Sequence, residues 1–176
     1  MYSRIFALIA LAVGLVSLFS FSLCAAAEPQ RPLDKTTVDT LDLARYLGHW
    51  YEIARKPHFF ERGLTHAKAT YTLRTDGRID VLNEGIKNGK PKSAKGKART
   101  TDVAGQLKVT FFLFPGEYNV LELGPDYSYS VVGGSDEGYL WILSRTPTME
   151  PEVLNGIYSR LRERGYDLSD LILVEQ

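Results

Sequence analysis

Two residues far apart in this 176-residue chain are suited to one specific interaction: Trp50, just after Gly48-His49, and Arg145, which closes the apolar segment Trp141–Ser144. A guanidinium plane lying on an indole face forms a cation–π contact of about 0.5–2 kcal/mol. Arginine suits this contact better than lysine because its charge is planar and delocalised. We therefore predict that the two side chains meet, and that Gly48, Trp50 and Arg145 close one end of a barrel.

The remaining residues that often do chemistry form no catalytic or metal-binding pattern. His49, His58 and His66 lack metal-ligand spacing, and no nucleophile elbow or phosphate-binding glycine loop is present. Gly133-Gly134-Ser135-Asp136 has the composition of a turn. We expect no catalytic residue, no metal and no cofactor.

Residues 1–27 have the pattern of an export signal. Arg4 supplies a positive start, residues 5–23 are almost entirely apolar, and Ala25-Ala26-Ala27 offers a cleavage site. Two alternatives stay open. The apolar run is nearly long enough to remain as a membrane anchor, and Cys24 could carry a lipid, although lipoprotein signals favour a small residue where Leu23 stands. Simple cleavage before Glu28 is preferred.

Without that segment, the chain has 149 residues with 20 basic and 21 acidic side chains. This length suits one domain, and the near-zero net charge argues against nucleic acid as a partner. Cys24 is the only cysteine, so the exported domain has no disulfide. We expect a polar leader over residues 28–40, one domain over residues 41–176, and a monomer or homodimer.

From Trp50 onward, strand-like segments alternate with turn signals such as Asp76-Gly77 and Asn88-Gly89. Eight strands are predicted, at 50–55, 65–74, 78–86, 93–101, 106–113, 117–123, 127–133 and 139–145. Short links make consecutive strands antiparallel neighbours. We predict an all-β fold: an eight-stranded antiparallel up-and-down β-barrel.

A single helix should follow the last predicted strand. Thr148 is its expected N-cap and Gly165 its stop, and Val153, Leu154, Ile157, Tyr158 and Leu161 make one apolar face. This face should pack on the outside of the barrel. A short turn of helix is predicted over residues 41–46, and a short closing strand over residues 171–174.

Three segments resemble the signatures of the lipocalin family, and their residues are most similar to those of the bacterial outer-membrane lipocalins and their apolipoprotein D relatives. They are Gly48-His49-Trp50-Tyr51-Glu52-Ile53-Ala54-Arg55, Pro125-Asp126-Tyr127, and Tyr139-Leu140-Trp141-Ile142-Leu143-Ser144-Arg145-Thr146-Pro147. The resemblance covers about residues 40–175. It implies a calyx whose closed end is sealed by Trp50 and Arg145, and whose other end admits an apolar ligand.

Strand alternation predicts the lining of this calyx. If Arg145 faces inward, Leu143 and Trp141 do too, whereas Leu140 and Ile142 face outward under the helix. Extending the alternation to the other strands predicts a ligand-binding set of Ala69, Tyr71, Val81, Asn83, Val109, Phe111, Tyr118, Tyr129 and Trp141. A one-residue slip would invert any strand.

These features favour a carrier of the cell envelope that binds or stores fatty acids or lysophospholipids, in the periplasm or at the outer membrane. The resemblance implies a role in membrane maintenance, and the N-terminus could attach the protein to a membrane. Two alternatives remain: an enzyme, such as an isomerase or reductase, that uses the pocket, or a solid barrel that acts through its surface. The basic cluster from Lys90 to Arg99 suits a solvated edge strand, with contact to an anionic membrane as the alternative.

Overall fold

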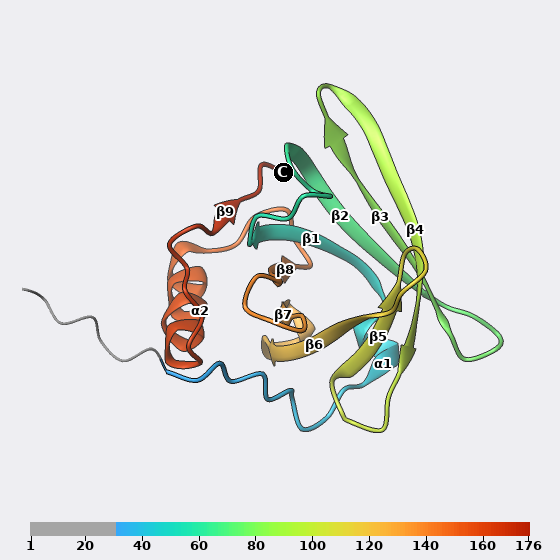
Figure 1. The fold of residues 1–176 in the computed structure, drawn as a ribbon, viewed down its shortest axis with the longest axis horizontal. Helices are drawn as coiled ribbons and strands as arrows, with labels where there is room; N and C mark the ends of the chain where they lie inside the picture. Colours follow the sequence, from blue (N-terminus) through green and yellow to red (C-terminus); the bar gives the residue numbers. More distant parts are fainter. Residues whose placement is uncertain (1–30) are drawn as a thin grey trace, which may run out of the picture.

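Eight antiparallel strands close into a barrel with one helix packed on its outer surface (Figure 1). The computed structural model describes residues 31–176, so the predicted signal peptide and Cys24 lie outside the described residues. The elements are α1 (Leu43–Tyr46), β1 (Gly48–Arg55), β2 (Leu64–Leu73), β3 (Ile79–Lys87), β4 (Lys90–Thr100), β5 (Gln106–Thr110), β6 (Gly116–Leu123), the 3-10 turn η1 (Pro125–Tyr127), β7 (Tyr129–Gly133), β8 (Leu140–Ser144), α2 (Pro151–Glu163) and β9 (Ile172–Leu173).

Closure of the barrel follows from the strand pairing. Each strand from β1 to β8 pairs antiparallel with the next, and β1 also pairs with β8. The predicted fold, with one helix outside, is confirmed. No helix within residues 31–176 has the length and apolar character needed to span a bilayer.

The last residues of the chain complete the seam between β1 and β2. These two strands pair directly only from Gly48 to Tyr51, and β9 pairs with the other end of β1. The Gln176 side chain donates to the carbonyl oxygens of Glu52 and Ala67, one on each strand. Two backbone carbonyl groups at the widened part of the seam, those of Glu52 and Ala67, are thereby satisfied.

Helix α2 covers the outer face of the sheet. Ile157 and Leu161 are fully buried against the outward side chains of Leu140 and Ile142, as predicted. The helix begins at Pro151 with Glu150 as its N-cap, so the predicted N-cap at Thr148 is wrong. A proline fits the first helical position because it has no N–H to satisfy, and the Thr148 carbonyl accepts instead from the Thr146 hydroxyl.

The predicted contact between Trp50 and Arg145 closes one end of the barrel. The guanidinium carbon of Arg145 lies 3.7 Å from the centroid of the buried Trp50 ring. Arg145 also donates to the backbone carbonyl oxygens of His49 at 2.8 Å and Arg45 at 2.6 Å. It thus joins β8, β1 and α1. Gly48 adopts φ +93°, and a Cβ there would lie 3.6 Å from Arg145 Nη1, so the backbone conformation demands glycine more than the space does.

We expect Arg145→Ala to lower the free energy of unfolding by about 2–3 kcal/mol, because it removes the stacking and several charge-assisted hydrogen bonds. For a chain of this size the melting temperature should fall by roughly 5–10 °C. Arg162→Ala is the matched control, since Arg162 lies 6.0 Å from the Tyr158 ring on the surface of α2. Thermal unfolding by circular dichroism measures both, and an unchanged melting temperature for Arg145→Ala would refute the role of the contact.

Candidate functional site

Eight of the nine predicted ligand-binding side chains face the barrel interior. Tyr71 and Val81 belong to the interior apolar cluster that contains Trp50, and five others pack against it: Ala69, Val109, Phe111, Tyr118 and Trp141. Asn83 pairs with Ala69 in the β2–β3 ladder, and directly paired residues share a face of the sheet. The sheet therefore brings these residues together, as predicted.

Tyr129 is the exception, and its predicted inward orientation is wrong. It packs in the outer cluster beneath α2, where its hydroxyl donates to Glu122 at 2.6 Å and Arg160 lies within hydrogen-bond distance. Val131 is turned outward with it. The 3-10 turn η1, with positive φ at Asp126 and Tyr127, precedes β7 and interrupts the period of two. Ser130 and Val132 occupy the inward positions, paired with Leu143 and Trp141.

The closed half of the interior is filled by side chains. The hydroxyls of Tyr46 and Tyr118 are 2.7 Å apart, Tyr71 and Tyr118 are 3.0 Å apart, and Ser130 lies 3.0 Å from Tyr46. Burial raises the pKa of all three tyrosines, to about 12 for Tyr46, so they remain neutral. The void recorded beside them measures only about 10 Å³, room for about one water molecule.

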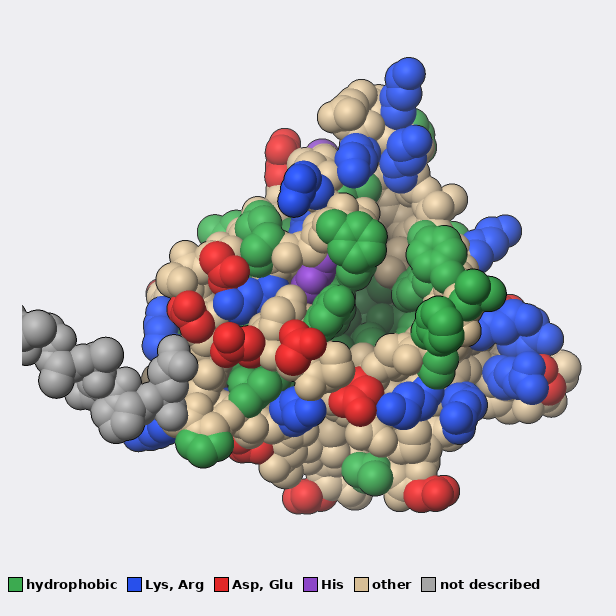
Figure 2. Space-filling model, in the orientation of Figure 1, with side chains coloured by type: hydrophobic (Ala, Val, Ile, Leu, Met, Phe, Trp, Pro, Cys, Tyr) green, Lys and Arg blue, Asp and Glu red, His purple; other side chains and the backbone are tan. Residues whose placement is uncertain are grey.

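The other half of the interior is open. Ala69, Asn83, Val109 and Trp141 point inward yet are only half-buried, so solvent reaches them from the far end. Figure 2 shows a hollow there, with hydrophobic side chains on both sides. Gly96 makes room for the Phe111 ring on this wall, since a Cβ at position 96 would lie 2.9 Å from that ring. The site is therefore a cup with a solid base.

A buried ionic network lies at one side of the cup. Arg55 is 3% exposed and donates to Glu52 Oε1 at 2.6 Å and to the carbonyl oxygens of Glu61 and Leu64 at 2.9 Å. The Trp141 indole donates to Glu61 Oε2 at 3.1 Å. The network ties the β1–β2 loop, residues 56–63, to the barrel wall. Two carboxyl groups therefore share one guanidinium away from bulk water.

Charge burial shifts the titration of this cluster. Burial, reinforced by the Glu61 carboxylate and opposed by Arg55, raises the pKa of Glu52 to about 8. Burial also raises the pKa of Glu61. Nearby, His58 stacks between Tyr139 and Phe60, with ring centroids 5.1 Å from each. Burial and then Arg55 lower the pKa of His58 to about 4. The aromatic stack is therefore uncharged at neutral pH.

This network is absent from the predicted site, which contained tyrosines as its only titratable side chains. A signal for one member was present, because Glu52 follows Trp50 by two residues and alternation places both on the same face. The pairing of Glu52 with Leu143 confirms that orientation. Glu61 had no comparable signal, since it lies in a loop and reaches the interior only through the fold of that loop.

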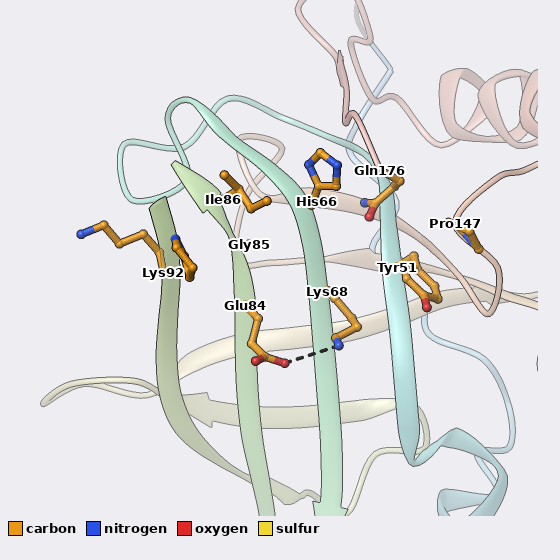
Figure 3. Close-up of a pocket in the computed structure, with 10 residues that line it drawn as sticks. Tyr51, His66, Lys68, Glu84, Gly85, Ile86, Lys92, Pro147 and Gln176 are labelled. Carbon is orange, nitrogen blue, oxygen red and sulfur yellow. Dashed lines mark ion pairs between the residues drawn. The ribbon is translucent and has the colours of Figure 1, made fainter. Parts of the chain in front are cut away.

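A second depression, of about 310 Å³, lies on the outer face of β1, β2 and β3 (Figure 3). Tyr51, Lys68 and Glu84 line it, and the last two form an ion pair at 3.5 Å. None of the predicted ligand-binding residues contributes to its wall. It is therefore separate from the barrel interior.

We expect Glu52 to make the protein less stable as pH rises. Its pKa is 4.5 in the unfolded chain and about 8 in the folded protein, so the folded state holds more protons between these values. The contribution of Glu52 to the free energy of unfolding is thus fully present below pH 4.5 and is lost as the pH rises towards 8. His58 acts oppositely, because its lowered pKa costs stability only as pH falls below 6.5. The range from pH 6.5 to 8 therefore reports on the buried carboxyl groups of Glu52 and Glu61, and a Glu52 variant isolates the part that depends on Glu52.

Between these two pH values the wild-type protein should lose about 1–2 kcal/mol, and Glu52→Gln much less. Urea unfolding at both pH values measures the difference. Glu84→Gln, at the exposed pair with Lys68, is the control that should keep the wild-type slope. Equal slopes for Glu52→Gln and wild type would show that Glu52 does not hold the proton.

Comparison with known proteins identifies the fold. The family model for the lipocalin-like domain matches residues 41–176. The outer membrane lipoprotein Blc of Escherichia coli K12 is 44% identical over 162 residues, covering 89% of this chain and 92% of Blc. Mouse apolipoprotein D is 31% identical over 151 residues, covering 78% of each chain. The structure of insecticyanin from the tobacco hornworm superposes with a TM-score of 0.68 at 22% identity, covering 84% of this chain and 87% of insecticyanin.

The family match covers both the segment that supplies Trp50 and the segment that supplies Arg145, together with the strands that form the cup. Geometry and sequence similarity thus agree over the whole barrel, and the chain belongs to the lipocalin family.

Proposed function

We propose that this protein binds fatty acids or lysophospholipids in its cup, and stores or transports them for maintenance of the bacterial envelope. The observation that supports the proposal is the open, largely apolar half of the barrel interior above a solid base. Binding of a small hydrophobic ligand is consistent with membership of the lipocalin family. The eight inward residues predicted to bind ligand are proposed as its wall.

The chemistry of the cup suits an amphiphile. Each methylene buried against Val109, Phe111 or Trp141 contributes about 0.8 kcal/mol, so a long acyl chain reaches micromolar affinity even after the costs of ordering. The tyrosine hydroxyls at the base hydrogen-bond to one another, so they do not need a polar headgroup as a partner. The headgroup would lie at the mouth, near Phe59, Phe60, Arg62 or Lys87.

Catalysis is less well supported by the same geometry. Glu52 and Glu61 are titratable groups inside the barrel, which an isomerase or reductase would need. Both are engaged, however: Arg55 binds Glu52, and Trp141 and Arg55 hold Glu61. Their arrangement supports a structural role in fixing the β1–β2 loop. A solid barrel acting only through its surface is disfavoured by the hollow in Figure 2.

For localisation, we propose export to the periplasm or the outer membrane, with Cys24 carrying the lipid anchor. The Escherichia coli relative is described as an outer membrane lipoprotein, and this favours lipidation of Cys24 over cleavage before Glu28.

Protein purified in native form should carry acyl lipids that mass spectrometry identifies. Ala69→Trp should abolish their retention, because the indole would fill the cup. Thr72→Trp places the same side chain on the exposed outer face of β2 and should retain them. A folded Ala69→Trp protein that binds lipid as the wild type does, or repeated failure to find lipid in the wild type, would contradict the carrier function.

Metabolic labelling with palmitate should mark the wild-type protein and not Cys24→Ser. Cell fractionation should find the wild type in the outer membrane and the serine variant in the periplasm. An unlabelled wild-type protein beginning at Glu28 would show that the signal is simply cleaved.

A further inference from the structure

The up-and-down topology gathers four links at the open end of the barrel. Strand β1 runs from the closed end to the mouth, so every second link lies at the mouth. These are the links at residues 56–63, 88–89, 111–115 and 134–139, and the other links lie at the closed end. Each of the four has its own chemistry. In order around the rim they are aromatic, basic, apolar and acidic, where the basic character comes from lysines of β3 and β4 beside Asn88-Gly89.

The two apolar links expose large side chains to solvent. Phe59 of the β1–β2 loop is 80% exposed, and Phe112, Leu113 and Phe114 of the β5–β6 loop are 85–87% exposed. Figure 2 shows hydrophobic side chains standing on either side of the hollow. No other large apolar side chain within residues 31–176 is so exposed, since the next are Leu173 at 65% and Val103 at 52%. Such clustering indicates a contact surface rather than random exposure.

The basic link lies between the two apolar ones. Lys90 and Lys92 begin β4, and Lys95 lies at the middle of this strand. All three are exposed, and none of them forms an ion pair within the described part of the chain. The acidic link, with Asp136 and Glu137, is on the opposite side of the barrel, between β7 and β8. The mouth therefore has one side that is both apolar and positively charged, and an opposite side that is negatively charged.

We propose that the mouth docks on an anionic lipid bilayer, tilted so that the β1–β2, β3–β4 and β5–β6 links meet the membrane and the β7–β8 link stays in water. Aromatic side chains favour the interface between headgroups and acyl chains, and the lysines are attracted by anionic headgroups. A membrane satisfies both halves of this surface at once. Docking by the rim does not depend on whether the cup carries lipid.

Vesicle flotation tests the proposal on the full chain in a Cys24→Ser background, which removes the proposed lipid anchor equally from every protein. The mouth variant is Phe112→Ser with Leu113→Ser and Phe114→Ser. The control variant is Leu73→Ser with Val103→Ser, at exposed apolar positions of the closed end, 50% and 52% exposed. On vesicles of phosphatidylglycerol and phosphatidylcholine, the mouth variant should partition about tenfold less than wild type, and the control like wild type.

A second variant tests the charge. Lys90→Gln with Lys92→Gln and Lys95→Gln should lose the preference for phosphatidylglycerol over pure phosphatidylcholine vesicles, along with the weakening of binding by salt. Arg78→Gln with Arg99→Gln, towards the closed end, should keep both. A preference that survives the lysine changes would overturn the proposed orientation.

Displacement of a fluorescent fatty acid in vesicle-free buffer separates docking from carriage. The mouth variant should bind the fatty acid normally, so failure of the carrier function and failure of docking give different results. Wild-type partitioning by the mouth variant would overturn the proposal. Equal loss of partitioning by the control variant would also overturn it. A mouth variant that binds vesicles normally but changes from dimer to monomer in sedimentation would assign the surface to a second copy of the chain instead.

Discussion

The contact of Arg145 with Trp50 organises the closed end because it joins parts of the chain that are otherwise far apart. The guanidinium stacks on the indole and at the same time binds carbonyl oxygens of β1 and α1. A charge placed there has hydrogen-bond partners on one side and a π face on the other, so its partial burial is compensated. Trp50 in turn donates to the Tyr46 carbonyl at 2.8 Å. The lid of α1 is thereby held across the barrel end.

Polar groups inside the barrel divide its interior into two halves. At the base, three tyrosines and Ser130 satisfy one another and pack tightly, which makes this half part of the core. Towards the mouth, Arg55 contacts the carboxyl groups of Glu52 and Glu61 and anchors the β1–β2 loop. Burying two carboxyl groups beside one guanidinium costs stability. The same contacts hold the rim beside the cup in a defined shape. Between the two polar clusters, the wall of the interior is apolar and accessible.

The same topology that closes the sheet also gives the two ends of the barrel different structures. Alternate links fall at opposite ends of an up-and-down barrel. The closed end is built from α1 and links of uniform length, whereas the loops of the open end vary from residues 88–89 to residues 56–63. Variation in those loops leaves the sheet unchanged. An aromatic and basic rim can therefore sit on a barrel whose stability is provided elsewhere.

Much of this architecture was accessible from the sequence. Period-two alternation and turn dipeptides predicted eight strands and their order, and the inward faces of β2, β3, β5, β6 and β8 followed from Arg145 and Trp50. Alternation failed for Tyr129 because η1 breaks the period just before β7, a backbone irregularity that side-chain types do not reveal. The network of Glu61 with Arg55 and Trp141, and the sharing of tyrosine hydroxyls, were decided only by tertiary structure. They depend on how a loop folds back and on distances across the barrel, and neither is encoded in the local period of any one strand.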